Sequence, residues 1–159
     1  MKQFASSLLI LLLTGAPAYA GVSSPSSYDD RARELQKERE RLARENDPVD
    51  RAKIGIKISD LLLENVADSV REGNLEGMQM ELAAYTSAIE SAHQTLVDSG
   101  RNGQKKSSGF VEFEIALRKQ VRKFDDYARM LATDRRGPIE QAKKLATGIQ
   151  NKLLKAIFP

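Results

Sequence analysis

The sequence predicts an all-α protein: an antiparallel bundle of about four helices, preceded by a charged helical arm and a cleaved signal peptide. Three observations favour helices. Apolar residues recur at spacings of three and four along most of the chain. Charged residues make up 30% of the sequence, whereas aromatic residues make up 6% and tryptophan is absent. Few glycines and prolines lie outside the expected loops, which is typical of long amphipathic helices.

Residues 1–20 have the three parts of a secretory signal peptide. Lys2 gives a positive start, residues 8–13 (LLILLL) form an apolar core, and Ala18 and Ala20 supply the small residues that signal peptidase requires before Gly21. The apolar core is shorter than the roughly 20 residues that span a membrane. We therefore expect cleavage before Gly21 and a periplasmic or secreted product, with no transmembrane segment in the mature chain.

The two segments after the cleavage site are polar. Residues 21–27 (GVSSPSS) form a Ser-rich linker without apolar periodicity. Residues 28–46 alternate in charge and carry a thin apolar stripe, chiefly Leu35 and Leu42, so we expect a helical arm with little to pack against the rest of the protein. Whether this arm docks on the bundle is left open by the sequence.

The bundle domain is expected over 47–159 and begins with a helical hairpin over 47–97. Asp47 and Pro48 are suited to cap and start its first helix, and Gly73 is suited to end it. The second helix has a coiled-coil-like seam of residues three and four apart. Its members are Leu75, Met78, Leu82, Tyr85, Ile89, Ala92 and Leu96.

A loop is expected over 98–109, because this segment has three glycines and no large apolar residue. A second hairpin follows over 110–158, with helices at about 110–132 and 139–158 and a turn at 133–138 (TDRRGP). Its apolar repeat runs through Phe113, Leu117 and Phe124 in one helix and through Ile149 and Leu153 in the other.

Residues 47–96 resemble a helical hairpin of secreted and envelope-associated bacterial proteins of unassigned function. The resemblance is carried by the acidic residue and glycine that end the first helix (REGNL, 71–75) and by the segment ELAAYTSAIESA in the second. Tetratricopeptide repeats contain similar segments, but here the helical hairpin occurs once, without the period of about 34 residues that a repeat array has. The resemblance implies a helical interaction or structural module, and no catalytic residues.

The sequence contains no recognisable motif for a catalytic, cofactor-binding or metal site. His93 is the only histidine and there is no cysteine, so the usual zinc ligand sets are missing. Phosphate-binding glycine loops and nucleophile elbows are missing too. The carboxylates Glu112 with Glu114 and Asp125 with Asp126 are expected to keep a helix surface soluble. We therefore expect a protein that is not an enzyme and binds no cofactor.

The charge distribution is uneven. Residues 48–100 carry 4 basic and 9 acidic residues, whereas 101–159 carry 14 and 6. The basic half contains the candidate contacts to an anionic surface: Arg118, Lys119, Arg122, Lys123 and Arg129. The plainer interpretation is that these charges are solvated or neutralised by the acidic half. Specific nucleic-acid binding is not expected, because no aromatic residues are interleaved with these cations.

The C-terminal segment KLLKAIFP has more apolar residues than one narrow seam needs, which favours packing in the bundle or against a second copy over insertion into a membrane surface. The sequence thus predicts an exported, non-enzymatic helical module, structural or protein-binding, in a bacterial envelope, with an unidentified protein as partner. The alternative is a peripheral protein that binds anionic envelope surfaces, lipid or phosphate-rich polymer, through its basic C-terminal half.

Overall fold

The computed structural model describes residues 25–101, 103–105 and 108–158, and within them the protein is all-helical, as predicted. The signal peptide expected at 1–20 lies outside these residues. The elements are α1 (Pro25–Arg44), α2 (Pro48–Glu72), α3 (Leu75–Asp98), α4 (Phe110–Met130), the short 3-10 helix η1 (Thr133–Arg135) and α5 (Gly137–Ile157). None of the described helices is long and apolar enough to cross a membrane.

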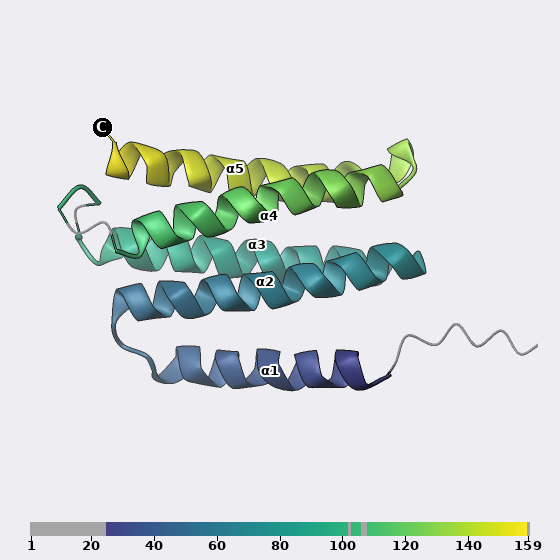
Figure 1. Ribbon diagram of the computed structural model, residues 1–159, viewed down its shortest axis with the longest axis horizontal. Helices are drawn as coiled ribbons and strands as arrows, with labels where there is room; N and C mark the ends of the chain where they lie inside the picture. Colours follow the sequence, from purple (N-terminus) through teal and green to yellow (C-terminus); the bar gives the residue numbers. More distant parts are fainter. Residues whose placement is uncertain (1–24, 102, 106–107, 159) are drawn as a thin grey trace, which may run out of the picture.

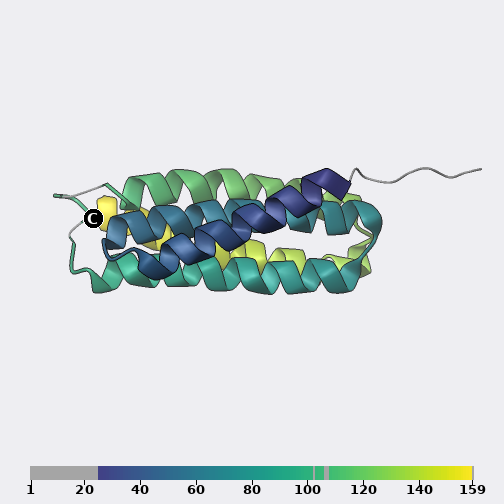
Figure 2. The same ribbon diagram turned by 90° about the horizontal axis from the view of Figure 1, so that it is seen from below.

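Helices α2 to α5 form a four-helix unit (Figure 1). Helix α2 contacts α3 and α4, and α5 contacts α4 and α3, so each of the four has two neighbours and the ring closes around one core. Helix α1 lies outside this ring and packs on α2, on the side away from α4 and α5 (Figure 1). Figure 2 shows that α1 crosses the long direction of the unit at an angle.

The hairpin of α2 and α3 begins and ends as the sequence indicated. The Asp47 carboxylate accepts hydrogen bonds from the backbone N–H groups of Val49 and Asp50, which would otherwise lack partners at the helix start. Gly73 ends α2 in the left-handed conformation with φ 70°, which only glycine adopts without strain. Asn74 then caps α3 by accepting a hydrogen bond from the Gly77 N–H.

The seam of α3 packs into the core, where every predicted member is buried except the half-buried Leu75. Helices α2 and α3 approach closely at Gly55, since a Cβ on this residue would lie 2.8 Å from the Cβ of Ala92. Glycine therefore allows a helix spacing that a larger residue would prevent. The buried aromatic rings of Tyr85 and Phe124 meet edge to face, 5.3 Å apart.

The second hairpin differs from the prediction at its turn. Helix α4 ends at Met130, because Leu131 turns to an extended conformation (ψ 148°) and buries its side chain in the core. Helix α5 begins at Gly137 inside the predicted turn, since Pro138 fits the first turn of a helix. Glu114, expected at the solvent surface, is buried and accepts hydrogen bonds from Arg118 and Gln150.

The charged arm is docked, mainly by ionic contacts. Arg31 is only 13% exposed and contacts Asp68 and Glu64 of α2, while Lys57 of α2 lies between Glu34 and Glu38. Leu35 is the one fully buried apolar side chain among the described side chains of α1. The helix also begins at Pro25, within the predicted linker, because proline is well suited to a first helical turn. The thin apolar stripe was thus no guide to whether this helix docks.

The first part of the loop after α3 contacts two helix ends. The Arg101 guanidinium donates a hydrogen bond to the Asp47 carboxylate at 3.0 Å. Gly103 lies directly against α5, since a Cβ there would be 2.7 Å from the Ala156 carbonyl oxygen. These contacts hold the loop to the start of α2 and to the end of α5.

Candidate functional site: the groove between α3 and α5

A long surface groove runs between α3 and α5. It consists of two hollows of about 870 and 500 Å³ that share Gln141 and Leu145. Its α3 wall extends from Gln79 to Gln94, a distance of roughly 22 Å at about 1.5 Å per helical residue. We term it the α3–α5 groove.

The wall formed by α3 carries little charge. Helix α3 has four acidic residues and neither lysine nor arginine, which is unusual for a chain with 30% charged residues. Its residues toward the groove are small or uncharged: Gln79, Ala83, Thr86, Ser87, Ser91 and Gln94, with Glu90 the one carboxylate. A surface of small, uncharged side chains allows another chain to approach closely without displacing charges from water.

The wall formed by α5 contains a glycine that the fold itself does not require. Gly148 lies in the middle of α5, has an ordinary helical backbone and would have no atom within 4 Å of an added Cβ. A mid-helix glycine costs about 0.5–1 kcal/mol relative to alanine. No contact within the described chain explains this residue, and its effect is to keep the groove open.

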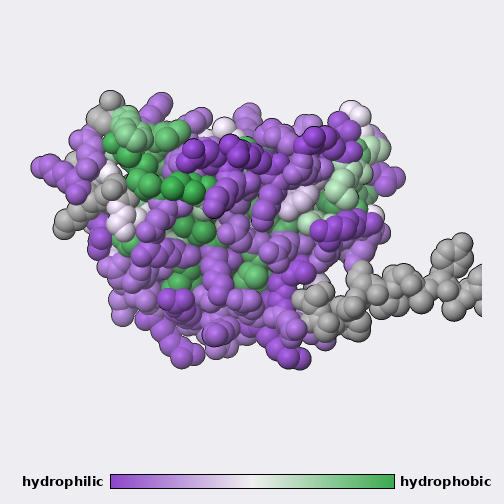
Figure 3. Space-filling model, viewed as in Figure 1, coloured by the Kyte–Doolittle hydropathy of each residue, from purple (hydrophilic) through white to green (hydrophobic). Residues whose placement is uncertain are grey.

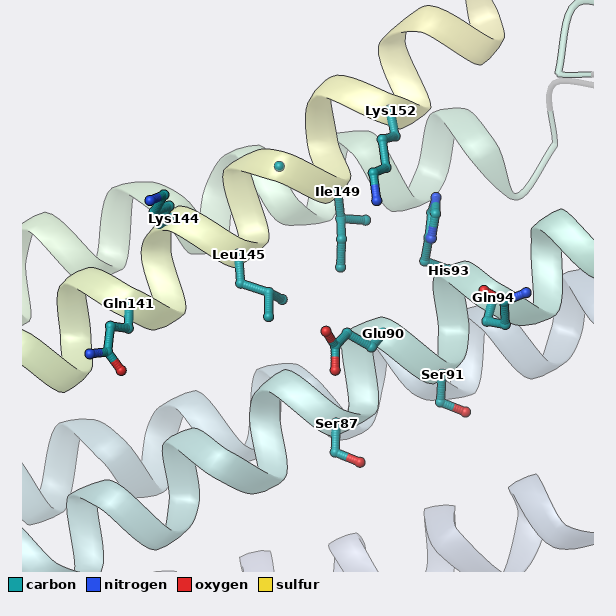
Figure 4. Close-up of a pocket in the computed structure, with 11 residues that line it drawn as sticks. Ser87, Glu90, Ser91, His93, Gln94, Gln141, Lys144, Leu145, Ile149 and Lys152 are labelled. Carbon is teal, nitrogen blue, oxygen red and sulfur yellow. The ribbon is translucent and has the colours of Figure 1, made fainter.

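A small polar cluster lies at one end of the groove (Figure 4). His93 of α3 and Lys152 of α5 point toward one another across it, and Glu90 points from α3 toward α5, where Leu145 and Ile149 reach back. Burial lowers the pKa of His93, and the positive charge of Lys152 lowers it further. The imidazole is therefore neutral at physiological pH and can both donate and accept a hydrogen bond.

Within the described part of the chain, no group of three or more His, Cys, Asp or Glu side chains converges to hold a metal ion. The acidic pairs weighed from the sequence are not joined in one site either. Glu114 is buried against Arg118 and Gln150, and Asp126 pairs with Arg129. The groove is lined by hydrogen-bonding groups and by apolar side chains.

The five predicted anionic contacts lie on α4 and take no part in the groove. Three have carboxylate partners: Arg118 with Glu114, Lys123 with Asp60 and Arg129 with Asp126. Lys119 and Arg122 are exposed and form no ion pair with the described residues. The structure thus gives two unpaired cations on this face in place of five.

The C-terminal segment is divided between core and surface. Leu153 is buried, Leu154 and Ile157 are half-buried, and Phe158 is 72% exposed. Figure 3 shows hydrophobic side chains gathered where α4 begins and α5 ends, whereas the face over α1 is almost entirely hydrophilic. Ile115, exposed to 38%, also belongs to α4 near this end.

Sequence reasoning missed the groove because it looked for reactive or charged residues. Two features of the sequence point to it: no lysine or arginine occurs between Arg71 and Arg101, and Gly148 lies in the middle of the apolar repeat of the last helix. No protein-family model, no curated protein and no solved structure matches this chain. The assignment of a function therefore rests on the residues of this chain alone.

Proposed function

We propose that this protein is an exported helical interaction module that binds a helical segment of a partner protein in the α3–α5 groove. The observation that carries the proposal is the groove itself, which is long and open and has an α3 wall of mostly small, uncharged side chains. Its length of roughly 22 Å matches about four turns of helix. An amphipathic helix laid into a groove is a common mode of protein recognition.

The groove also defines the chemistry of the partner segment. Leu145 and Ile149 provide the apolar contact, and Gly148 leaves room for a bulky side chain of the partner. Lys144 and Lys152 line the α5 wall and Glu90 the α3 wall, so the partner helix is expected to bear acidic residues on the edge that faces α5. Because the apolar contact lies in the middle of the groove wall and the charges are few, binding of the partner helix should weaken only modestly as the salt concentration rises.

The proposed location is the bacterial envelope. Support for it comes from residues 1–20, with a basic start, a short apolar core and small residues before Gly21. Cleavage of this segment would leave α1 to α5 intact, because α1 begins at Pro25. We accordingly place the module in the periplasm or outside the cell.

Photo-cross-linking in the source cells tests the proposal. A photoreactive residue is placed at Gln94 in the groove, at Lys119 on α4 or at Arg33 on α1. We expect a discrete cross-linked protein from Gln94 alone, retained at high salt and lost in a Gly148→Leu background, where the leucine fills the groove. Equal yields from all three positions, or a cross-link unaffected by Gly148→Leu, would contradict it.

A second candidate function is contact with an anionic envelope surface through α4. It is favoured by Lys119 and Arg122, which are exposed and free of carboxylate partners among the described residues. Co-sedimentation with anionic vesicles should then weaken with salt and be lost in a Lys119→Ala/Arg122→Ala double variant. An Arg118→Ala/Arg129→Ala variant is the matched control, because both of these arginines already have partners.

A further inference from the structure

A separate cavity of about 290 Å³ lies where α1, α2 and α3 meet. Its volume is at the lower end of the roughly 300–1,000 Å³ that ligand pockets occupy. It is less open than the α3–α5 groove and is divided from it by the ridge that bears Ser87 and Ser91. Neither His93 nor any of the five basic residues of α4 lines this cavity.

The cavity has an apolar floor and two basic side chains. Leu42 of α1, Ile58 and Leu62 of α2, and Ala84, Ala88 and Ala92 of α3 supply the apolar surface. Arg39 of α1 and Arg51 of α2 are the charged members of the lining, and no carboxylate belongs to it. A site of this composition is electrostatically complementary to an anionic group attached to an apolar body.

Arg39 differs from the other arginines of α1. Arg31, Arg33, Arg41 and Arg44 each contact a carboxylate, whereas Arg39 forms no ion pair with any described residue. The reason is visible in the sequence, since the positions three and four residues away from Arg39 are Leu35, Gln36, Leu42 and Ala43. The arginine of α1 that lines the cavity is thus the one whose charge is not neutralised.

Arg51 is held in a fixed position beside the same cavity. Its Nη1 donates hydrogen bonds to the carbonyl oxygens of Leu42 and Glu45, at 3.0 and 2.8 Å, at the end of α1. Nη2 and Nε form no hydrogen bond with the described residues, so these donors remain for a ligand. A guanidinium already fixed by backbone carbonyls loses little conformational entropy when it binds a carboxylate.

We propose that this cavity binds a small anionic amphiphile, a carboxylate on a short aliphatic chain. The chain lies against Ile58, Leu62 and Ala88, and the carboxylate lies between Arg39 and Arg51. A volume of 290 Å³ holds about ten non-hydrogen groups at roughly 30 Å³ each, which is the size of octanoate. Because α1 contributes Leu42 and Arg39, the site exists only while α1 is docked on α2.

Titration of the intact protein with octanoate, followed by calorimetry and by amide NMR shifts, tests the proposal. We expect saturable binding of one octanoate with shifts confined to the three helices around the cavity. Arg39→Gln should raise the dissociation constant about tenfold. Arg33→Gln, on the exposed side of the same helix, should leave it unchanged. Octanol should bind the wild type more weakly than octanoate binds Arg39→Gln, because octanol loses the charge contacts with both Arg39 and Arg51.

Ala88→Leu fills the cavity and should abolish binding of octanoate, with retention of the fold checked by circular dichroism. The proposal is overturned if no saturable binding occurs, if octanol and octanoate bind equally well, or if folded Ala88→Leu binds octanoate like the wild type. Gly148→Leu, in the α3–α5 groove, should leave octanoate binding intact. Failure of this proposal and failure of the proposed function can therefore be told apart.

Discussion

The hydroxyl of Tyr85 donates a hydrogen bond to the side-chain carbonyl of Gln120 across the core, at 2.9 Å, and joins α3 to α4. The Gln120 amide in turn donates to the hydroxyl of Ser59 and the carboxylate of Asp60 on α2. Burial raises the pKa of Tyr85, and the negative charge of Asp60 raises it further, so the hydroxyl remains a donor. Three helices that the apolar seam alone would allow to slide are thereby held in one register.

This network predicts a measurable coupling between its members. Tyr85→Phe leaves the Gln120 carbonyl buried without its donor and should cost about 1–3 kcal/mol of the free energy of unfolding. Gln120→Leu should cost a similar amount, because the Tyr85 hydroxyl then loses its acceptor. Denaturant unfolding of the double variant should show a loss smaller than the sum by about 1 kcal/mol. Strictly additive losses would contradict the coupling.

Docking of α1 should depend on pH. The hydrogen bond from Lys57 of α2, together with its positive charge, lowers the pKa of Glu34 on α1. A carboxyl whose pKa is lower in the folded state than in the unfolded state stabilises the fold when it is ionised. This stabilisation is complete above the ordinary pKa of about 4 and is lost as the pH falls through the lower pKa of the folded state. The hydrogen-exchange protection factors of α1 should therefore fall below about pH 4, before those of α3 do.

The matched control for this pH effect is Lys57→Gln. It removes the shared partner of Glu34 and Glu38, and Glu38 is only 3% exposed. The protection factors of α1 should already be low at neutral pH in this variant and should change less on acidification. Equal protection of α1 in the wild type and in Lys57→Gln would show that the ionic contacts do not hold the helix.

Two glycines inside helices should respond to alanine in opposite ways. Gly148→Ala should raise the free energy of unfolding by about 0.5–1 kcal/mol, because the new methyl group meets no atom within 4 Å. Gly55→Ala should lower it by about 1–3 kcal/mol, because its Cβ would lie 2.8 Å from that of Ala92. Thermal unfolding of both variants shows whether each substitution raises or lowers the stability. A destabilised Gly148→Ala would show that this glycine is needed for packing within the protein.

The C-terminal segment offers a contrast between buried and exposed apolar residues. Leu153→Ala should cost about 2–5 kcal/mol, since the leucine is 1% exposed in the core. Phe158→Ala should change the free energy of unfolding by less than about 0.5 kcal/mol, because the ring is mostly in solvent. Chemical denaturation of the two variants measures this difference, and comparable losses would mean that Phe158 packs against something.

The fold was predictable where one residue determines the local backbone. Asp47, Gly73 and the apolar repeat of α3 each have a physical role that is visible in the sequence, and the all-helical class follows from such patterns. The buried polar residues were not predictable. Gln120, Ser59 and Asn65 are polar by residue type, and only the packing of three helices shows that they lie inside.

The candidate sites were even harder to predict from the sequence than the buried polar residues. Docking of α1 depends on Lys57 lying between two carboxylates, a relationship between helices that no periodicity within one helix encodes. Arg39 is distinguished from the neighbouring arginines of α1 only by the structure, in which Arg33, Arg41 and Arg44 each pair with a carboxylate. The basic residues of α4 were recognised as a set, yet the partners of Arg118, Lys123 and Arg129 come from their positions in three dimensions and along the helix.

The lack of lysine and arginine in α3 has a practical consequence for proteomics. Trypsin cuts after these two residues, so the sequence from Glu72 to Arg101 leaves a digest as a single peptide that contains the entire helix. Amine-reactive reagents cannot label this peptide internally, and any mass shift on it reports chemistry at other side chains. A shift found there together with protection of Lys144 and Lys152 would mark a molecule seated between the two walls.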